Sequence, residues 1–226
     1  MSYVVANWKM KMSFEDVNNW VRGFSSNFKE ISDSGVKAVI APTFLHVPYV
    51  KAQLAAEGYL DKVSLGVQNL SANEKGSHTG EVGAFQVKDF CNYAIVGHSE
   101  RAEGPALVAE KRDAALDAGV TPIVCFTSPS QAEFFHKEGV VLAWEDPENI
   151  SSDGEYNEKP LDAIVETVSE IRKLIPQEAE LLYGGSVNRE NIVNLVSVEG
   201  LDGVLVGHAS LDPLHFLDLI KSYEIS

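Results

Sequence analysis

Cysteine is scarce in this chain of 226 residues, which contains only Cys91 and Cys125. Both lie within apolar stretches, and neither belongs to a spacing that binds metals. We therefore expect two free, buried thiols in a reducing cytoplasm. No pair of histidines has ligand spacing with a third ligand nearby, so we expect no metal and no other cofactor.

Positive charge is also scarce, because 18 Lys and Arg stand against 33 Asp and Glu, a formal net charge of −15. The sequence has no basic cluster, which argues against a nucleic-acid partner. An acidic surface supports solubility but does not determine a fold. An anionic substrate would have to be attracted by local groups, against the overall field.

Long hydrophobic runs are missing, since none reaches the roughly 18 residues of a membrane span. The first ten residues, MSYVVANWKM, lack the basic and apolar regions of a signal peptide. We therefore expect a cytoplasmic protein without a membrane partner. Linkers and low-complexity tracts are absent too, so we expect a single domain over residues 1–226.

Short runs rich in Val, Ile and Ala are present, and amphipathic segments separate them. Several runs are apolar on both faces, such as VKAVIA and GVLV, which is typical of parallel strands covered on both sides. The runs are Tyr3–Trp8, Val36–Ala41, Val63–Gln68, Tyr93–His98, Thr121–Phe126, Val140–Glu145, Glu180–Tyr183 and Gly203–Val206.

Helical segments are expected between these runs. The clearest is Leu161–Leu174, where apolar residues recur at spacings of three and four. Ser128-Pro129-Ser130-Gln131 predicts a helix start with Ser128 as the cap, and Asp212-Pro213 predicts the start of the last helix.

Eight repeats of strand and helix form either an open doubly wound sheet or a closed barrel. The dinucleotide fingerprint G-x-G-x-x-G is absent, because the first run continues into Asn7-Trp8-Lys9. This favours an α/β fold of the (βα)8 barrel type, whose active site lies at the C-terminal ends of the strands.

Polar residues gather at these strand ends, and together they suit proton transfer on a phosphorylated substrate. A carboxylate and an imidazole can move protons, a lysine and an amide can stabilise an enediolate, and glycine-rich turns can bind phosphate. The residues are Asn7, Lys9, His98, Ser99, Glu100, Glu145, Gly184, Gly185, Ser186, Gly207 and His208.

Each of these residues also has a purely structural interpretation when it is taken alone. Glu145 could be a solvated surface residue, His98 a hydrogen-bonded structural histidine, and Lys9 a surface charge. Glu100 could mainly orient Lys9, and Ser186 could cap a helix. The set as a whole favours catalysis, and it does not form a Ser-His-Asp triad.

The same residues lie in motifs that resemble triosephosphate isomerases from end to end. The motifs are Ala6-Asn7-Trp8-Lys9-Met10, Gln68-Asn69, Thr79-Gly80-Glu81-Val82, Val96-Gly97-His98-Ser99-Glu100-Arg101, Ala143-Trp144-Glu145, Tyr183-Gly184-Gly185-Ser186-Val187 and Val204-Leu205-Val206-Gly207. Their order and spacing match the family, and the short length and Gly76–Gly80 resemble its compact archaeal branch.

The resemblance implies an isomerase that interconverts dihydroxyacetone phosphate and D-glyceraldehyde 3-phosphate. It implies that Glu145 removes the carbon-bound proton while a neutral His98 acts on the substrate oxygens. Lys9 would supply positive charge, Asn7 would hold the intermediate, and Glu100 would contact the lysine. The residues implied in phosphate binding are Ser151, Gly185, Ser186, Gly207 and His208.

Two segments depart from the family pattern. The polar segment Glu145–Pro160 is too long for an ordinary turn and is expected to be a lid over the site. Glu145, the expected catalytic base, is followed by Asp146 where the family has proline. The tip of the lid reads Ile150-Ser151-Ser152-Asp153 where the family reads Ile-Gly-Thr-Gly. Gly207-His208 replaces a pair of glycines.

The resemblance also implies self-association. The polar loop Asn69–Val82 resembles the family's interlocking dimer loop, with Thr79 reaching the partner's site near Asn7 and Lys9. We expect a dimer, and compact relatives suggest a tetramer.

Two other functions compete with the isomerase. One is a different phosphosugar isomerase or an aldolase, but an aldolase needs a Schiff-base lysine on the sixth strand, where Glu145 stands. The other is a non-catalytic phosphate sensor, which the set of Asn7, Lys9, His98 and Glu145 argues against.

The polar tip of the expected lid should make closure slower or less complete. An enediolate phosphate exposed to water eliminates its phosphate, so this chain should release more methylglyoxal per isomerisation than a relative with a glycine tip. The measurement is methylglyoxal formed per turnover in a coupled assay. A ratio no higher than that of the glycine-tipped relative would contradict the idea.

Overall fold

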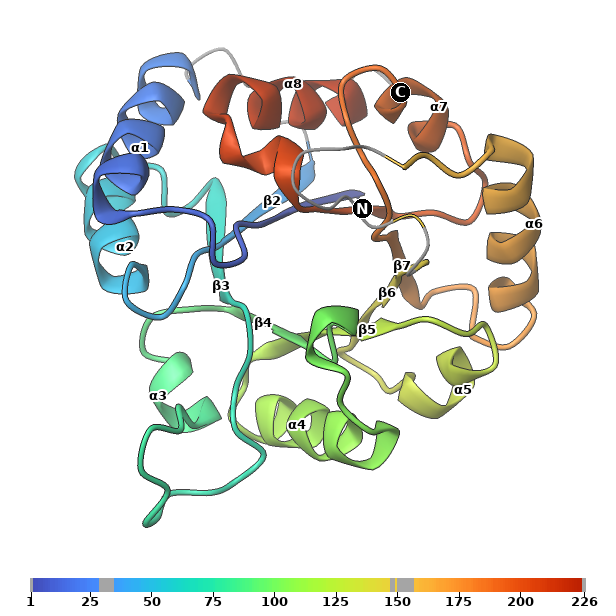
Figure 1. Cartoon of the computed structure of the whole chain (residues 1–226), viewed down its shortest axis with the longest axis horizontal. Helices are drawn as coiled ribbons and strands as arrows, with labels where there is room; N and C mark the ends of the chain where they lie inside the picture. Colours follow the sequence, from blue (N-terminus) through green and yellow to red (C-terminus); the bar gives the residue numbers. More distant parts are fainter. Residues whose placement is uncertain (1, 29–34, 147–148, 150–156, 225–226) are drawn as a thin grey trace.

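A computed structural model of the chain describes residues 2–28, 35–146, 149 and 157–224. Eight parallel strands form a closed barrel in sequence order, with the helices around it (Figure 1). This confirms the predicted (βα)8 barrel. The strands are β1 (Ser2–Asn7), β2 (Val36–Ala41), β3 (Val63–Val67), β4 (Tyr93–Val96), β5 (Thr121–Phe126), β6 (Val141–Trp144), β7 (Glu180–Tyr183) and β8 (Gly203–Val206).

A helix follows each strand, and short 3₁₀ turns come after β4 and β8. The α-helices are α1 (Phe14–Phe28), α2 (Val47–Ala56), α3 (Ala84–Val87), α4 (Pro105–Asp117), α5 (Gln131–Phe135), α6 (Leu161–Arg172), α7 (Ile192–Val196) and α8 (Pro213–Glu224). The 3₁₀ turns are η1 (Ser99–Arg101) and η3 (His208–Leu211). The segment between β3 and α3 projects away from the barrel (Figure 1).

Two predicted helix boundaries were wrong by two or three residues, and a tighter terminal turn explains each. Helix α6 ends at Arg172 rather than Leu174, because the N–H groups of Lys173 and Leu174 donate to the carbonyls three residues earlier, those of Glu170 and Ile171. Helix α5 begins at Gln131 rather than after Ser128, since the N–H groups of Gln131 and Ala132 donate to the carbonyls three residues earlier, and the predicted bond between the Ser128 N–H and Gln131 Oε1 is present at 3.0 Å. The start of α8 is confirmed, with the Asp212 carboxylate accepting the N–H of His215.

Alternate residues of the strands face the inside of the barrel, as the period of two requires. In β1, Tyr3 and Val5 belong to the interior cluster, whereas Val4 and Ala6 join the larger cluster between the strands and the helices. The interior cluster is Tyr3, Val5, Val39, Ala41, Tyr93, Ile95, Ile123, Cys125, Val141, Ala143, Leu182 and Leu205. Both cysteines are free and buried, as predicted.

The N-terminal end of the barrel is closed by Tyr3, whose ring meets Tyr93 edge to face. Its hydroxyl donates to Glu180 at 2.6 Å and accepts from Lys37 at 2.9 Å. Burial, followed by the bond to Glu180, raises the pKa of the Tyr3 hydroxyl. The open end is therefore the opposite one, where the strands finish. In the part of the chain that the structure describes, no helix is long and apolar enough to cross a membrane.

Gly203 stands where β8 passes β1 too closely for any side chain, because an added Cβ would lie 2.1 Å from the Tyr3 carbonyl oxygen. Gly203→Ala should therefore lower the free energy of unfolding by about 3 kcal/mol through overpacking. The matched control is Gly104→Ala, since an added Cβ there meets nothing within 4 Å. Because Gly104 is the N-cap of α4, where alanine is less favourable than glycine, the control should lower stability by no more than about 1 kcal/mol. Equal urea midpoints for the two variants would contradict this explanation.

Candidate active site

The strand alternation carries four residues into the open mouth of the barrel. Asn7 follows the inward Tyr3 and Val5 of β1 in the same phase, and Glu145 continues the inward phase of β6. Gly184 and Gly207 extend β7 and β8 in the same way, after Leu182 and Leu205. The side chains of Asn7 and Glu145 thus meet above the last apolar layer, where the two glycines leave room.

A small pocket lies at this mouth and brings together most of the residues expected from the sequence. It is lined by Asn7, Lys9, His98, Glu145, Gly184, Gly185, Leu205, Gly207 and His208. Glu100 and Ser186 do not line it. Glu100 accepts a hydrogen bond from Lys9, and the Ser186 hydroxyl donates to the Asn149 carbonyl. Thr79 lies in the projecting loop, exposed, and Ser151 is outside the described residues, as is the whole tip at 150–153.

The Glu145 carboxylate is the most buried ionisable group of this pocket, with its side chain 1% exposed. One oxygen accepts the N–H of Ser99 at 2.9 Å, and the other lies 2.9 Å from Nε2 of His98. A buried carboxylate requires such partners, because leaving it unpaired would cost about 3–5 kcal/mol. A Cβ on Gly184 would lie 3.0 Å from its Cγ, so the glycine gives the side chain space.

His98 reaches the pocket because Gly97, with φ of +71°, turns the chain at the end of β4. A Cβ on Gly97 would press on Val108 at 2.6 Å, so only glycine fits there. The N–H of Glu100 donates to Nδ1 of His98 at 3.3 Å. Nδ1 therefore carries a lone pair, and the ring proton lies on Nε2, directed at Glu145.

Lys9 has a left-handed backbone, with φ of +49°, and three groups hold it in place. Asn7 Oδ1 accepts its N–H at 3.1 Å, and Gln68 Nε2 donates to its carbonyl at 3.0 Å. Its Nζ donates to Glu100 Oε1 at 2.7 Å. Glu100 is 53% exposed and contacts the lysine from outside the pocket, so its place is that of a positioning residue.

Gln68 and Cys125 contribute to this site but were missing from the strand-end residues that we predicted for it, and Ser99, which was among them, contributes through its backbone. The Ser99 N–H is a backbone donor, which the identity of residue 99 does not reveal. Gln68 could have been found from the sequence, because it is a polar residue at the end of the apolar run Val63–Gln68. Burial and the nearby Glu145 carboxylate raise the pKa of the Cys125 thiol well above its usual value, so the thiol beneath the base stays neutral.

The groups expected at the phosphate differ in their surroundings. Gly185, Gly207 and the exposed His208 line the pocket. A Cβ on Gly185 would overlap the Tyr183 hydroxyl, so this position requires glycine. Ser186 is buried, and its hydroxyl donates to the Asn149 carbonyl at 2.8 Å and accepts the Asn157 N–H at 3.1 Å. That hydroxyl therefore joins backbone segments instead of facing the pocket.

A second cavity of about 340 Å³ opens beside the first and shares Asn7, Lys9 and His98 with it. Its outer wall includes Met10 and Phe44, and Met10 is 93% exposed. No group of three or more His, Cys, Asp or Glu in the described residues could hold a metal ion. The residues of β6 are VLAW, so this strand carries no lysine for a Schiff base.

Comparisons with known proteins agree with this arrangement. The family model of triosephosphate isomerase matches residues 2–223. A triosephosphate isomerase of Wolbachia pipientis wMel is 32% identical over 235 residues, which cover 98% of this chain and 93% of the relative. That of Thermus thermophilus is 32% identical, with 96% and 97% covered, and that of Colwellia psychrerythraea is 34% identical, with 94% of each covered.

Proposed function

Because this chain belongs to the triosephosphate isomerase family, we propose that the pocket at the mouth of its barrel performs the family's reaction with Glu145 as the base. The chain is an isomerase that interconverts dihydroxyacetone phosphate and D-glyceraldehyde 3-phosphate, a step of glycolysis and gluconeogenesis. The observation that carries the assignment of Glu145 is its buried carboxylate, 2.9 Å from the proton-bearing nitrogen of His98.

The first step is removal of a carbon-bound proton. The Nε2–H of His98, which now donates to Glu145, would donate its hydrogen bond to the substrate oxygens instead. The Glu145 carboxylate would then be free to turn to the neighbouring carbon. Glu145 then takes the proton, and the C–H electron pair forms the carbon–carbon double bond of an enediolate. The hydroxyl proton must also move from one substrate oxygen to the other, and His98 can carry it by giving its Nε2 proton to one oxygen and taking the hydroxyl proton of the other. Glu145 then returns the carbon-bound proton to the adjacent carbon, which completes the isomerisation without any other reactant.

The second requirement is stabilisation of the negative charge on the enediolate oxygens. Lys9 is the cation of the pocket, and its left-handed backbone is held by Asn7 and Gln68 before substrate arrives. The Nε2–H of His98 and the Asn7 amide complete the donor set. These groups attract an anion locally, in a chain whose net charge is −15.

The phosphate would be held by backbone N–H groups of the glycine-rich ends of β7 and β8, namely those of Gly185, Ser186, Gly207 and His208. Gly185 and Gly207 support this assignment, because both line the pocket and neither has a side chain that would cover its N–H. Ser151 would add the contact that the family makes from its lid.

The base is tested by Glu145→Gln, which keeps the side-chain shape but cannot accept the proton. The variant should lose at least about 10³-fold in kcat, near the contribution of a well-placed general base. Binding of inorganic phosphate, measured by calorimetry, should be unchanged and serves as the control. A kcat within tenfold of the native value would overturn the assignment of Glu145 as the base. A native chain that binds phosphate but has no measurable kcat would instead favour the sensor.

We also propose that two copies of the chain associate through the cavity beside the site. Exposed Met10 and Phe44 at its wall form an apolar surface of the kind that a partner covers. The exposed loop around Thr79 has the projecting shape that could fill it, bringing Thr79 near Asn7 and Lys9 of the other copy. The match over residues 2–223 supports one domain per chain, and central metabolism supports a cytoplasmic location.

Light scattering at micromolar concentration should therefore give twice the chain mass of 24.6 kDa, or four times that mass for a tetramer. Met10→Glu should shift the mass toward the single chain, because it puts a charge in the apolar interface. Val193→Glu, at an exposed apolar residue on α7, should leave the mass unchanged. A native protein of only about 25 kDa would refute the association.

A further inference from the structure

An ion pair lies directly beside the base. The carboxylate of Asp146, the residue after Glu145, accepts from the Nζ of Lys159. The two side chains are 14% and 22% exposed, so water screens this pair less than a surface pair. Lys159 precedes Pro160, the N-cap of α6. The pair therefore joins the end of β6 to the start of α6 across 13 positions of sequence.

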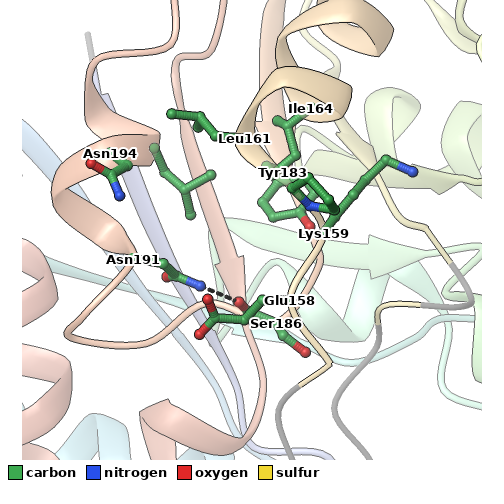
Figure 2. Close-up of a pocket in the computed structure, with 10 residues that line it drawn as sticks. Glu158, Lys159, Leu161, Ile164, Tyr183, Ser186, Asn191 and Asn194 are labelled. Atoms are coloured by element: carbon green, nitrogen blue, oxygen red, sulfur yellow. Dashed lines mark hydrogen bonds between the residues drawn. The ribbon is translucent and has the colours of Figure 1, made fainter.

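Lys159 contacts both neighbours of Glu145. Its Nζ pairs with Asp146, and it also lies 5.8 Å from the ring centroid of Trp144, a cation–π distance. Lys159 also lines a third cavity, of about 330 Å³, between the start of α6 and the residues that follow β7. Figure 2 shows its side chain extending away from Ser186 and Asn191, which line the same cavity. This single side chain therefore restrains the residue on each side of the base.

The backbone around the base is restrained on the other sides by neighbouring strands. The N–H of Glu145 donates to the Phe126 carbonyl at 2.8 Å, and the Trp144 carbonyl accepts the N–H of Gly184 at 2.8 Å. Both bonds lie at or before Glu145. After Glu145, the Asp146 carboxylate pairs with Lys159, the Asp146 carbonyl accepts the Asn149 N–H at 2.9 Å, and the Asn149 carbonyl accepts the Ser186 hydroxyl at 2.8 Å.

The ion pair matters because residue 146 is an aspartate where the family pattern has a proline. Where the family pattern has a proline, the ring would fix the φ angle of the residue after the base. Asp146 has no such ring, and its negative charge lies next to a carboxylate and near the place for an anionic substrate. Lys159 compensates for the missing ring by fixing the position of Asp146, and it also balances the negative charge of the Asp146 carboxylate.

We propose that Asp146 and Lys159 form a positioning pair that holds the backbone of the catalytic base in place of the family's proline. The proposal rests on the assignment of Glu145 as the base. The pair does not touch substrate. It keeps the Glu145 backbone fixed, so that the carboxylate reaches the carbon by rotating its side chain alone. Small displacements of a catalytic group cost large factors in rate, so the pair should affect turnover more than binding.

The test is a double-mutant cycle with Lys159→Met, Asp146→Ala and the double variant, assayed with dihydroxyacetone phosphate at a temperature where circular dichroism shows each variant folded. Each single variant should lose about tenfold in kcat, with KM changed less than threefold. The double variant should lose about the same tenfold, since both changes remove one interaction. Lys159→Arg, which keeps the cation, should stay within threefold of the native kcat.

The matched control is Lys137→Met, which removes an exposed ion pair with Asp113, 2.9 Å apart, that includes no residue of the pocket. Its kcat should equal that of the native chain. If Lys159→Met does not fold, Lys159→Gln takes its place in the cycle. A kcat within threefold of native in both single variants, or losses that multiply to about a hundredfold in the double variant, would overturn the positioning pair.

The two proposals fail separately. Full activity of Glu145→Gln would reject the assignment of Glu145 as the base, independently of the results for Asp146 and Lys159. An inactive Glu145→Gln together with fully active Lys159→Met and Asp146→Ala would leave the base in place and reject only the pair.

Discussion

The burial of one carboxylate sets the demands that the rest of this site meets. Glu145 is 1% exposed and satisfied by the Ser99 N–H and His98 Nε2. These partners come from the end of β4, where Gly97 turns the chain and the Glu100 N–H fixes the tautomer of His98. The carboxylate is thus buried and paired before substrate binds. A substrate that accepts the hydrogen bond of His98 in its place releases the carboxylate for reaction.

Barrel closure brings these groups together, because eight parallel strands end at the same mouth. The period of two then decides which residues point inward, so Asn7 and Glu145 follow the apolar layers of β1 and β6. Tyr3 closes the opposite end with Tyr93, which leaves a single open face for chemistry. In an acidic chain, the attraction for an anion is confined to that face, where Lys9 is prepositioned.

Features that depend on local periodicity could be predicted from the sequence, including the barrel, four of its strands residue for residue and the strand-end set around Glu145. The wrong helix limits at Gln131 and Arg172 have another cause. There the terminal turn has i→i−3 backbone bonds, and no pattern of apolar residues distinguishes such a turn from a regular helical one. Apolar patterns also do not encode the bond of the Ser99 N–H or that of Lys159, whose partner lies 13 positions earlier across a polar segment.

The central claim is that the Glu145 carboxylate carries the proton, and hydrogen exchange at carbon tests it without relying on product release. Dihydroxyacetone phosphate in D₂O, followed by NMR, should exchange its carbon-bound hydrogen rapidly with the native chain. With Glu145→Gln the exchange should slow by at least about 10³-fold, since the base that exchanges its proton with solvent is gone. Exchange at the native rate in that variant would contradict the account.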